Sequence, residues 1–320
     1  MHKKYLDFRT DMADERVDTY KKVHNLSEVD GIKVESKNAD GVITTTVDVL
    51  NENGKNAVKK DIGKYITIEL SNVNVLDDEE KEKIKDIVSE QIKILIGDDK
   101  DKSILVVGLG NEEVTPDALG PKVIKKVEIT RHLINFAKEL VESNTREVSA
   151  IAPGVLGTTG IETSEIIFSV VKKIKPDLLI VIDSLASSSI KRIGNTIQLS
   201  NTGITPGAGV RNKREGINEK TIGVPVIAIG VPTVVDMATI TNEAIDKMVD
   251  SAKEELTNFS NKLMEQKKVD SIFEFFERET RYDMISNILD TENYIVTPKE
   301  VDDLINDMSL IIAEGINKAV

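Results

Sequence analysis

Apolar and polar residues along this chain form two recurrent patterns, short continuous apolar runs and longer stretches with helical spacing. Strict alternation over residues 42–49 and 65–70 predicts half-buried antiparallel strands. Apolar residues three and four apart over residues 77–95 predict an amphipathic helix with an acidic first turn. The continuous runs, which predict fully buried strands, are residues 104–107, 178–182 and 224–230. These units predict an α/β fold: a mixed, mostly parallel sheet with helices on both faces and an N-terminal β-rich extension.

Other local signals complete this outline. Residues 1–30 are charge-dense and lack apolar periodicity, which indicates a frayed terminus that leads into a short helix. Residues 51–54, Asn-Glu-Asn-Gly, predict a turn. Residues 297–300, Thr-Pro-Lys-Glu, predict a capping box that opens a final helix towards Ala319. Another amphipathic segment is expected within residues 271–287.

Composition narrows the class of protein. A chain of 320 residues is long enough to bury a large core, and a net charge of −13 argues against a general nucleic-acid binder. The absence of cysteine removes thiolate chemistry and disulfides and fits a reducing cytosol. No secretory signal and no long apolar run is visible, so we expect a cytoplasmic protein without a membrane span.

Two aspartates follow buried strands. Asp117 comes after the run that ends at Val107, separated from it by a glycine-containing loop, and Asp183 comes directly after the run 178–182. The carboxyl ends of parallel strands meet at one edge of a sheet, so these side chains are expected at the same edge. Two carboxylates brought close share a proton and can act as general base and general acid. Each aspartate, taken alone, could instead support a helix start or cap a turn.

Weaker candidates surround this pair. Glu162 and Asp236 could assist a site, although each could simply cap a helix. The loop 154–160 is rich in Gly and Thr and could hold a phosphate on its N–H groups, line a peptide groove or be a tight connection. The three histidines are scattered, which disfavours a zinc protease, and no Gly-x-Ser-x-Gly supports a serine hydrolase. A third glycine is missing after Gly110, so nicotinamide binding is a poor match.

Seven segments resemble the germination proteases of spore-forming bacteria, endopeptidases that degrade small acid-soluble spore proteins. They are residues 105–123, 129–133, 149–167, 180–193, 201–214, 223–241 and 296–305. The Gly-x-Gly-Asn…Asp stretch and the strand-end aspartate also look like those of hydrogenase-maturation endopeptidases. The resemblance implies a phosphorylase/hydrolase-like α/β fold, no cofactor and a homotetramer, and it places the family's two catalytic aspartates on Asp117 and Asp183.

The resemblance also gives the N-terminus a meaning, because the family is made as an inactive zymogen that removes its own N-terminal segment. Family substrates are cut after an acidic residue followed by an apolar residue, alanine and further acidic residues. Residues 11–15, Asp-Met-Ala-Asp-Glu, have this form. We therefore expect cleavage between Asp11 and Met12, with residues 1–11 as propeptide and residues 12–320 as a single peptidase domain.

The sequence thus predicts an aspartate-dependent endopeptidase of the forespore or spore core, acting on small acid-soluble spore proteins. One alternative keeps the fold but makes the enzyme metal-dependent, with Asp117 or Asp183 as ligands. The other is a non-catalytic nucleotide- or phosphate-binding module built on residues 154–160.

Overall fold

The structure is a computed structural model that describes residues 10–39, 41–71, 73–99, 101–137, 139, 141–142, 145–206, 215–259, 285 and 294–320. Its strands are β1 (Ile32–Ala39), β2 (Val42–Val49), β3 (Gly63–Glu69), β4 (Ile104–Gly108), β5 (Val148–Ile151), β6 (Leu178–Ser187), β7 (Thr196–Ser200), β8 (Val226–Asp236) and β9 (Ile295–Val296). Its α-helices are α1 (Ala13–His24), α2 (Glu52–Val58), α3 (Asp78–Ile96), α4 (Leu119–Ile124), α5 (Arg131–Phe136), α6 (Leu156–Thr159), α7 (Thr163–Ile174), α8 (Glu219–Ile222), α9 (Met237–Phe259) and α12 (Val301–Ala319). Short 3-10 turns are η1 (Val73–Val75), η2 (Thr115–Asp117) and η4 (Ile190–Arg192).

One mixed sheet runs through the described chain in the order β1-β2-β3-β7-β8-β6-β4-β5, with β9 added to β8. The pairs β8–β6, β6–β4 and β4–β5 are parallel. The pairs β1–β2, β2–β3, β3–β7, β7–β8 and β8–β9 are antiparallel. The mixed α/β fold and the β-rich N-terminal extension are therefore confirmed. Parallel pairing is confined to one half, so the sheet is less parallel than expected, because β1–β3 join the same sheet through β7.

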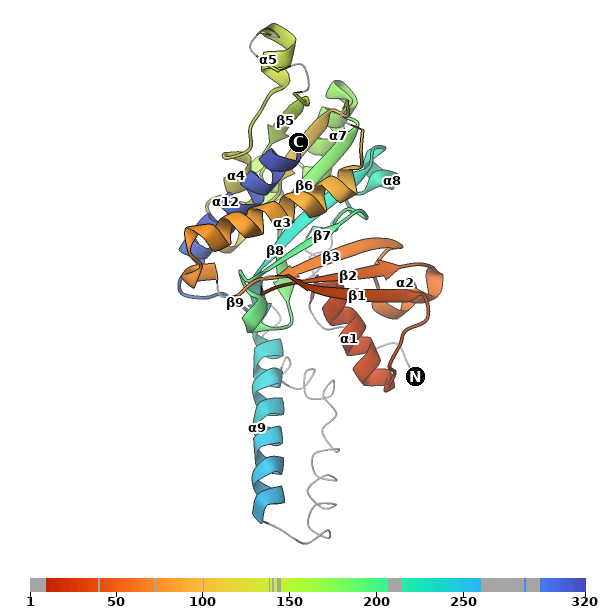
Figure 1. Cartoon of the computed structure of the whole chain (residues 1–320), viewed down its shortest axis with the longest axis vertical. Helices are drawn as coiled ribbons and strands as arrows, with labels where there is room; N and C mark the ends of the chain where they lie inside the picture. Colours follow the sequence, from red (N-terminus) through yellow and green to blue (C-terminus); the bar gives the residue numbers. More distant parts are fainter. Residues whose placement is uncertain are drawn as a thin grey trace.

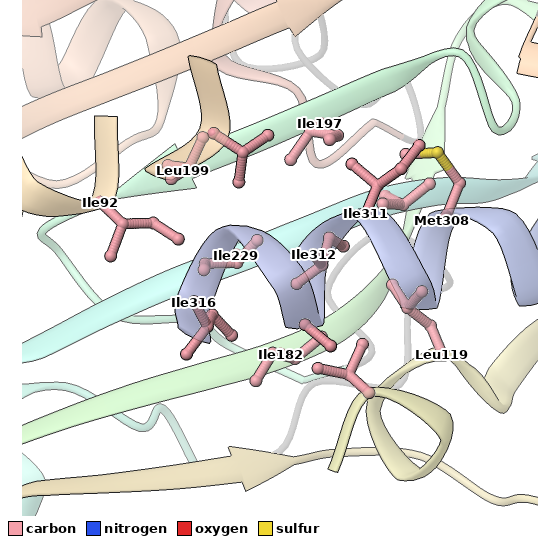
Figure 2. Packing of buried hydrophobic residues seen from close by; sticks show 14 of the residues in the cluster. Ile92, Leu119, Ile182, Ile197, Leu199, Ile229, Met308, Ile311, Ile312 and Ile316 are labelled. Atoms are coloured by element: carbon pink, nitrogen blue, oxygen red, sulfur yellow. The ribbon is translucent and has the colours of Figure 1, made fainter. Parts of the chain in front are cut away.

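Helices cover both faces of the sheet. On one face, α3 and α12 lie side by side over the central strands, and α4 packs beside them (Figure 1). Figure 2 shows the core between α12 and the sheet, where Ile312 and Ile316 face Ile182 and Ile229. The opposite face is covered by α7 and α8 at the parallel end and by α1 and α2 at the β2–β3 end.

The alternation of side chains along the strands assigns each residue to a face. In β6, Ile180 and Ile182 belong to the α3–α12 core, whereas Leu179 and Val181 pack under α7. In β7, Ile197 and Leu199 also face α3 and α12, so residue 198 points to the opposite face. The face opposite α3 and α12 therefore carries Asp183 and Gln198 between its two pairs of helices.

Several local expectations are corrected. Residues 51–54 begin α2, because Asn51 Oδ1 accepts hydrogen bonds from the N–H groups of Asn53 (2.9 Å) and Gly54 (3.1 Å) and so caps a helix. The capping box at 297–300 is wrong: Thr297 donates its hydroxyl to the Thr233 carbonyl (2.9 Å), and α12 begins after Glu300 without a side-chain cap. The segment 271–287 lies outside the described residues except for residue 285.

The N-terminal expectation of a frayed lead-in is wrong for the part of the segment that the structure describes. Thr10, Met12 and Ala13 are buried, with Met12 fully inaccessible to solvent. The charged residues Asp14 and Glu15 are also buried, because each has a partner in η4 or at the end of the sheet. The charge density that suggested a mobile tail instead reflects a segment held by ion pairs.

Candidate active site

Asp183 lies inside β6, which is longer than the apolar run predicts. Pairing with β4 ends at Ile182, so Asp183 is the first residue of β6 beyond the end of β4. On its other side it is paired with Gly230 of β8. The side chain is 7% exposed, and Oδ1 accepts a hydrogen bond from the N–H of Ser184 (2.9 Å). This carboxylate therefore lies within a central strand, just beyond the end of β4, and is largely shielded from water.

Asp117 ends the 3-10 turn η2 and is half-buried. Its Oδ2 accepts a hydrogen bond from the N–H of Asn111 (2.8 Å), which closes the loop after β4 on itself. Gly110 has a φ of 111°, and a Cβ there would lie 2.0 Å from the Asp117 carbonyl oxygen, so only glycine fits. The N–H of Leu109 donates to the carbonyl of Ile182 (2.8 Å).

These contacts place the two aspartates in one region of the molecule. The loop that bears Asp117 is hydrogen-bonded to the residue immediately before Asp183, and η2 packs against β6 and β8. Both residues therefore lie at the carboxyl end of neighbouring parallel strands, where open α/β sheets place their sites. Their chemical roles remain predictions.

Glu162 and Asp236 lie at helix starts. Asp236 ends β8 and is 2% exposed, and its carboxylate accepts hydrogen bonds from the N–H groups of Ala238 (3.2 Å) and Thr239 (3.1 Å) and from the Thr239 hydroxyl. These are the bonds of a helix cap for α9. Glu162 precedes α7, and its side chain does not cap that helix.

The loop 154–160 forms α6, a single helical turn. The N–H groups of Thr158 and Thr159 donate to the Val155 carbonyl (2.9 and 3.0 Å), and the N–H of Gly160 donates to the Leu156 carbonyl (2.8 Å). A phosphate site of this kind requires free N–H groups, and these three are already engaged. The phosphate-binding alternative gains no support from this geometry.

The peptide that joins Asp11 and Met12 lies against the end of β6. The N–H of Asp11 donates to the Ala186 carbonyl (2.8 Å), and Asp11 Oδ2 accepts from the N–H of Ala186 (2.9 Å). The carbonyl oxygen of Asp11 accepts two further hydrogen bonds, from Lys60 Nζ (2.5 Å) and Gln198 Nε2 (3.1 Å). The expected processing bond is thus held about three residues along the strand from Asp183.

A charged cluster holds the residues that follow this bond. Arg192 of η4 contacts Asp14 (2.6 Å), Glu15 (3.4 Å) and Glu69 (2.9 Å). Glu15 Oε2 also accepts hydrogen bonds from the Thr10 hydroxyl and from the N–H of Ser188 (2.8 Å). Burial raises the pKa of Glu15, and the contacts with Thr10, Arg192 and Ser188 oppose that rise.

Sequence reasoning missed Lys60, Gln198 and Arg192. Gln198 had one usable signal, since it is a polar residue in the middle of a buried strand, and such residues need a partner. For Lys60 and Arg192 the sequence offers no such signal, because only folding brings each side chain to its partners. Among the described residues, no group of three or more His, Asp or Glu side chains converges as a metal site requires. In the same part of the chain, no helix combines the length and the apolar character of a membrane span.

Comparison with known proteins identifies the family. The family model described as germination protease matches residues 9–284. The germination protease of Clostridium perfringens is 46% identical over 315 residues, covering 98% of this chain and 94% of the relative. That of Priestia megaterium is 42% identical over 345 residues, covering 98% and 93%.

Among solved structures, the [NiFe] hydrogenase maturation protease HycI from Thermococcus kodakarensis aligns at 20% identity. The alignment covers 45% of this chain and 80% of HycI with a TM-score of 0.31, too partial a superposition to indicate a shared mechanism. The match over nearly the whole length to curated relatives is the decisive finding. This chain belongs to the germination protease family and is a peptidase.

Proposed function

We propose that the chain is an aspartate-dependent endopeptidase, made as a zymogen that cuts its own Asp11–Met12 bond. Residues 1–11 are the propeptide and residues 12–320 the peptidase domain. The observation that carries the proposal is the seat of the Asp11–Met12 peptide, which is paired with the end of the strand that bears Asp183. The sequence around this bond has the form expected of family substrates.

Asp117 and Asp183 are assigned the acid and base roles. One carboxylate, as general base, takes a proton from water while the water oxygen attacks the carbonyl carbon of Asp11. The other carboxyl group donates its proton to the Met12 nitrogen as the C–N bond breaks, which leaves a carboxyl group on residue 11 and an amine on residue 12. Mildly acidic conditions favour this cycle because a close pair needs one protonated and one ionised member.

The substrates are the small acid-soluble spore proteins, cut after an acidic residue as the zymogen is. Such chains are disordered when free, so their backbone can take the extended conformation that Met12 takes here. The enzyme works as a homotetramer in the cytoplasm of the forespore and in the spore core, with no nucleic-acid or membrane partner.

Digestion of purified small acid-soluble spore proteins tests the catalytic assignment. Asp117→Asn and Asp183→Asn keep the size of each side chain but cannot carry the proton, so each is expected to abolish cleavage in a folded protein. Activity within about tenfold of wild type, a loss of only ~1.4 kcal/mol in transition-state stabilisation, would remove that residue from the mechanism. Cleavage that is lost on exhaustive chelation and restored by a divalent metal would favour the metal-dependent alternative.

A further inference from the structure

We propose that Lys60 and Gln198 form the oxyanion site of this enzyme, the pair of donors that stabilises negative charge on the carbonyl oxygen of the bond being cut. The inference rests on the proposed cleavage of Asp11–Met12 and adds two catalytic residues to it. Both side chains already donate to the Asp11 carbonyl oxygen, Lys60 Nζ at 2.5 Å and Gln198 Nε2 at 3.1 Å.

Gln198 brackets the peptide bond with its amide group. Its Oε1 accepts a hydrogen bond from the N–H of Ala13 (2.7 Å), and its Nε2 donates to the carbonyl of Asp11. The two contacts flank the Asp11–Met12 bond, one on each side. They also fix the orientation of the amide, because a flipped amide would lose both bonds. The side chain is 8% exposed, so water competes poorly for it.

Lys60 supplies a cation at the same carbonyl oxygen. The left-handed conformation of Lys59, with a φ of 55°, ends α2 and turns the chain before Lys60. The Lys60 ammonium group lies 5.7 Å from the centre of the Tyr65 ring. Burial lowers the pKa of Lys60 to about 8, and the nearby carboxylates of Asp11 and Asp14 oppose that shift. At the mildly acidic pH expected for processing, the group is therefore protonated.

Register across the sheet connects Gln198 to Asp183. Gln198 is paired with Gly230, and Gly230 is paired with Asp183, so the two side chains flank a glycine on the same face of the sheet. Two strand spacings separate their Cα atoms by about 10 Å. The Leu185 side chain lies over this glycine, and the Asp11 segment joins the two sides of the row, because Asp11 pairs with Ala186 of β6 and its carbonyl accepts from Gln198.

A hydrogen-bond donor accelerates hydrolysis only if it binds the transition state more tightly than the ground state. Attack by water turns the neutral Asp11 carbonyl oxygen into an oxyanion, and the C–N bond then breaks as the electron pair returns to re-form the C=O bond. A cationic donor gains more from that charge than a neutral one. Lys60 therefore contributes more than Gln198 if both are aligned on the oxyanion.

If Lys60 and Gln198 only held residues 10–13 in place, their contacts would slow processing instead of accelerating it. Loss of a clamp would free residues 10–13, and processing would become faster. Loss of an oxyanion donor slows the chemical step, typically by about 10²–10³-fold. The direction of the rate change therefore separates the two roles.

The test measures the rate at which the full-length chain removes residues 1–11, by intact mass, at mildly acidic pH. Lys60→Met and Gln198→Leu are both expected to slow processing by about 10²–10³-fold, with the larger loss in Lys60→Met. Lys60→Arg keeps the charge and is expected to recover part of the rate. Lys93→Met, a change at an exposed lysine of α3 on the other face of the sheet, is expected to process at the wild-type rate. Thermal unfolding of each unprocessed variant shows whether the fold is retained.

Digestion of a spore-protein substrate by the processed enzyme gives a second readout. After residues 1–11 leave, Lys60 and Gln198 are expected to bind the carbonyl of the substrate's acidic residue, so both variants should lower kcat more than they raise KM. Folded variants that process at the wild-type rate or faster would overturn the oxyanion site while leaving the processing site intact. A wild-type chain that never cuts Asp11–Met12 would instead overturn the proposed zymogen, and this inference with it.

Discussion

Glu15 is a buried carboxylate, and its burial makes the stability of the protein depend on pH. Its pKa is raised by desolvation, so folding favours its protonated form. A group of this kind contributes stability at low pH that is lost as the pH rises through the raised pKa of the folded state. In acid, therefore, Glu15 becomes less costly to bury, in contrast to the carboxylates whose pKa values are lowered by ion pairs.

Glu15→Gln is expected to remove this contribution. Urea unfolding over a pH series, with Asp183→Asn present in both proteins to block self-cleavage, measures the difference. As the pH falls towards the ordinary pKa range of glutamate, the free energy of unfolding should rise in the protein that keeps Glu15, relative to the Glu15→Gln variant. A difference that stays constant with pH, or that runs the other way, would contradict the raised pKa.

Gly110 has a backbone conformation that would be strained for any other residue. An alanine there would place Cβ 2.0 Å from the Asp117 carbonyl oxygen at a φ of 111°. Gly110→Ala is expected to destabilise the fold by roughly 1–3 kcal/mol and to displace Asp117, with loss of cleavage. Gly157→Ala is the matched control, since an added Cβ there meets nothing within 4 Å and its φ is not positive. Equal activity of the two variants would contradict the role of the tight turn.

Residues of the candidate site differ in how far the sequence predicts them. Asp117 and Asp183 follow apolar runs, so the local pattern locates both near the carboxyl ends of parallel strands, although β6 continues past Asp183 to Ser187. Lys60 and Gln198 meet the Asp11 carbonyl across 49 and 187 positions of the chain, and no local pattern reports such contacts. Lys60 and Gln198 come together because β3 pairs with β7, and the order of the apolar runs along the chain does not predict that pairing.

Helix α1 shows how charge holds an element in place. Arg192 joins its first turn to η4 and β3 through Asp14, Glu15 and Glu69, and the arginine side chain is 19% exposed. Burial lowers the pKa of Arg192, but Asp14 and Glu15 outweigh this and raise it overall, so the guanidinium stays charged. Removing one partner of a buried ion pair leaves the others without compensation.

Arg192→Met is therefore expected to reduce the free energy of unfolding by about 3–5 kcal/mol, less to the extent that Glu69 is solvated. Hydrogen exchange of residues 13–24 should accelerate more than exchange of the central strands, because the lost anchor is local. The exposed Lys191→Met is the control and should change neither quantity. Unaltered exchange in α1 of the Arg192→Met variant would show that the cluster does not hold this helix.

Element boundaries follow from sequence where the cap is satisfied locally. The helix expected over residues 77–95 is α3, and Asp77 and Glu80 form its capping box. The similar signal at residues 297–300 fails because the Thr297 hydroxyl is used by a carbonyl of β8. The N-terminal segment differs from the expected frayed tail for the same reason, since its polar groups find partners far along the chain.

Net charge affects the molecule as a whole. At −13 the chain repels itself near neutral pH, and acidification reduces that repulsion; in the proposed mechanism it also supplies the proton that the aspartate pair shares. Both effects favour processing in mild acid. Because the Asp11–Met12 bond is already seated against β6, processing needs no unfolding of the core, so the reaction is expected to be first order in a single chain.

The mass of the processed protein tests self-cleavage of the Asp11–Met12 bond. The wild-type chain and Asp183→Asn are incubated side by side under mildly acidic, dehydrating conditions with no other protease present, and intact mass and the new N-terminus are determined. The wild-type chain is expected to lose residues 1–11 and to begin at Met12, while Asp183→Asn stays full-length. A first residue other than Met12, or processing of Asp183→Asn at the wild-type rate, would contradict self-cleavage of this bond by the aspartate pair.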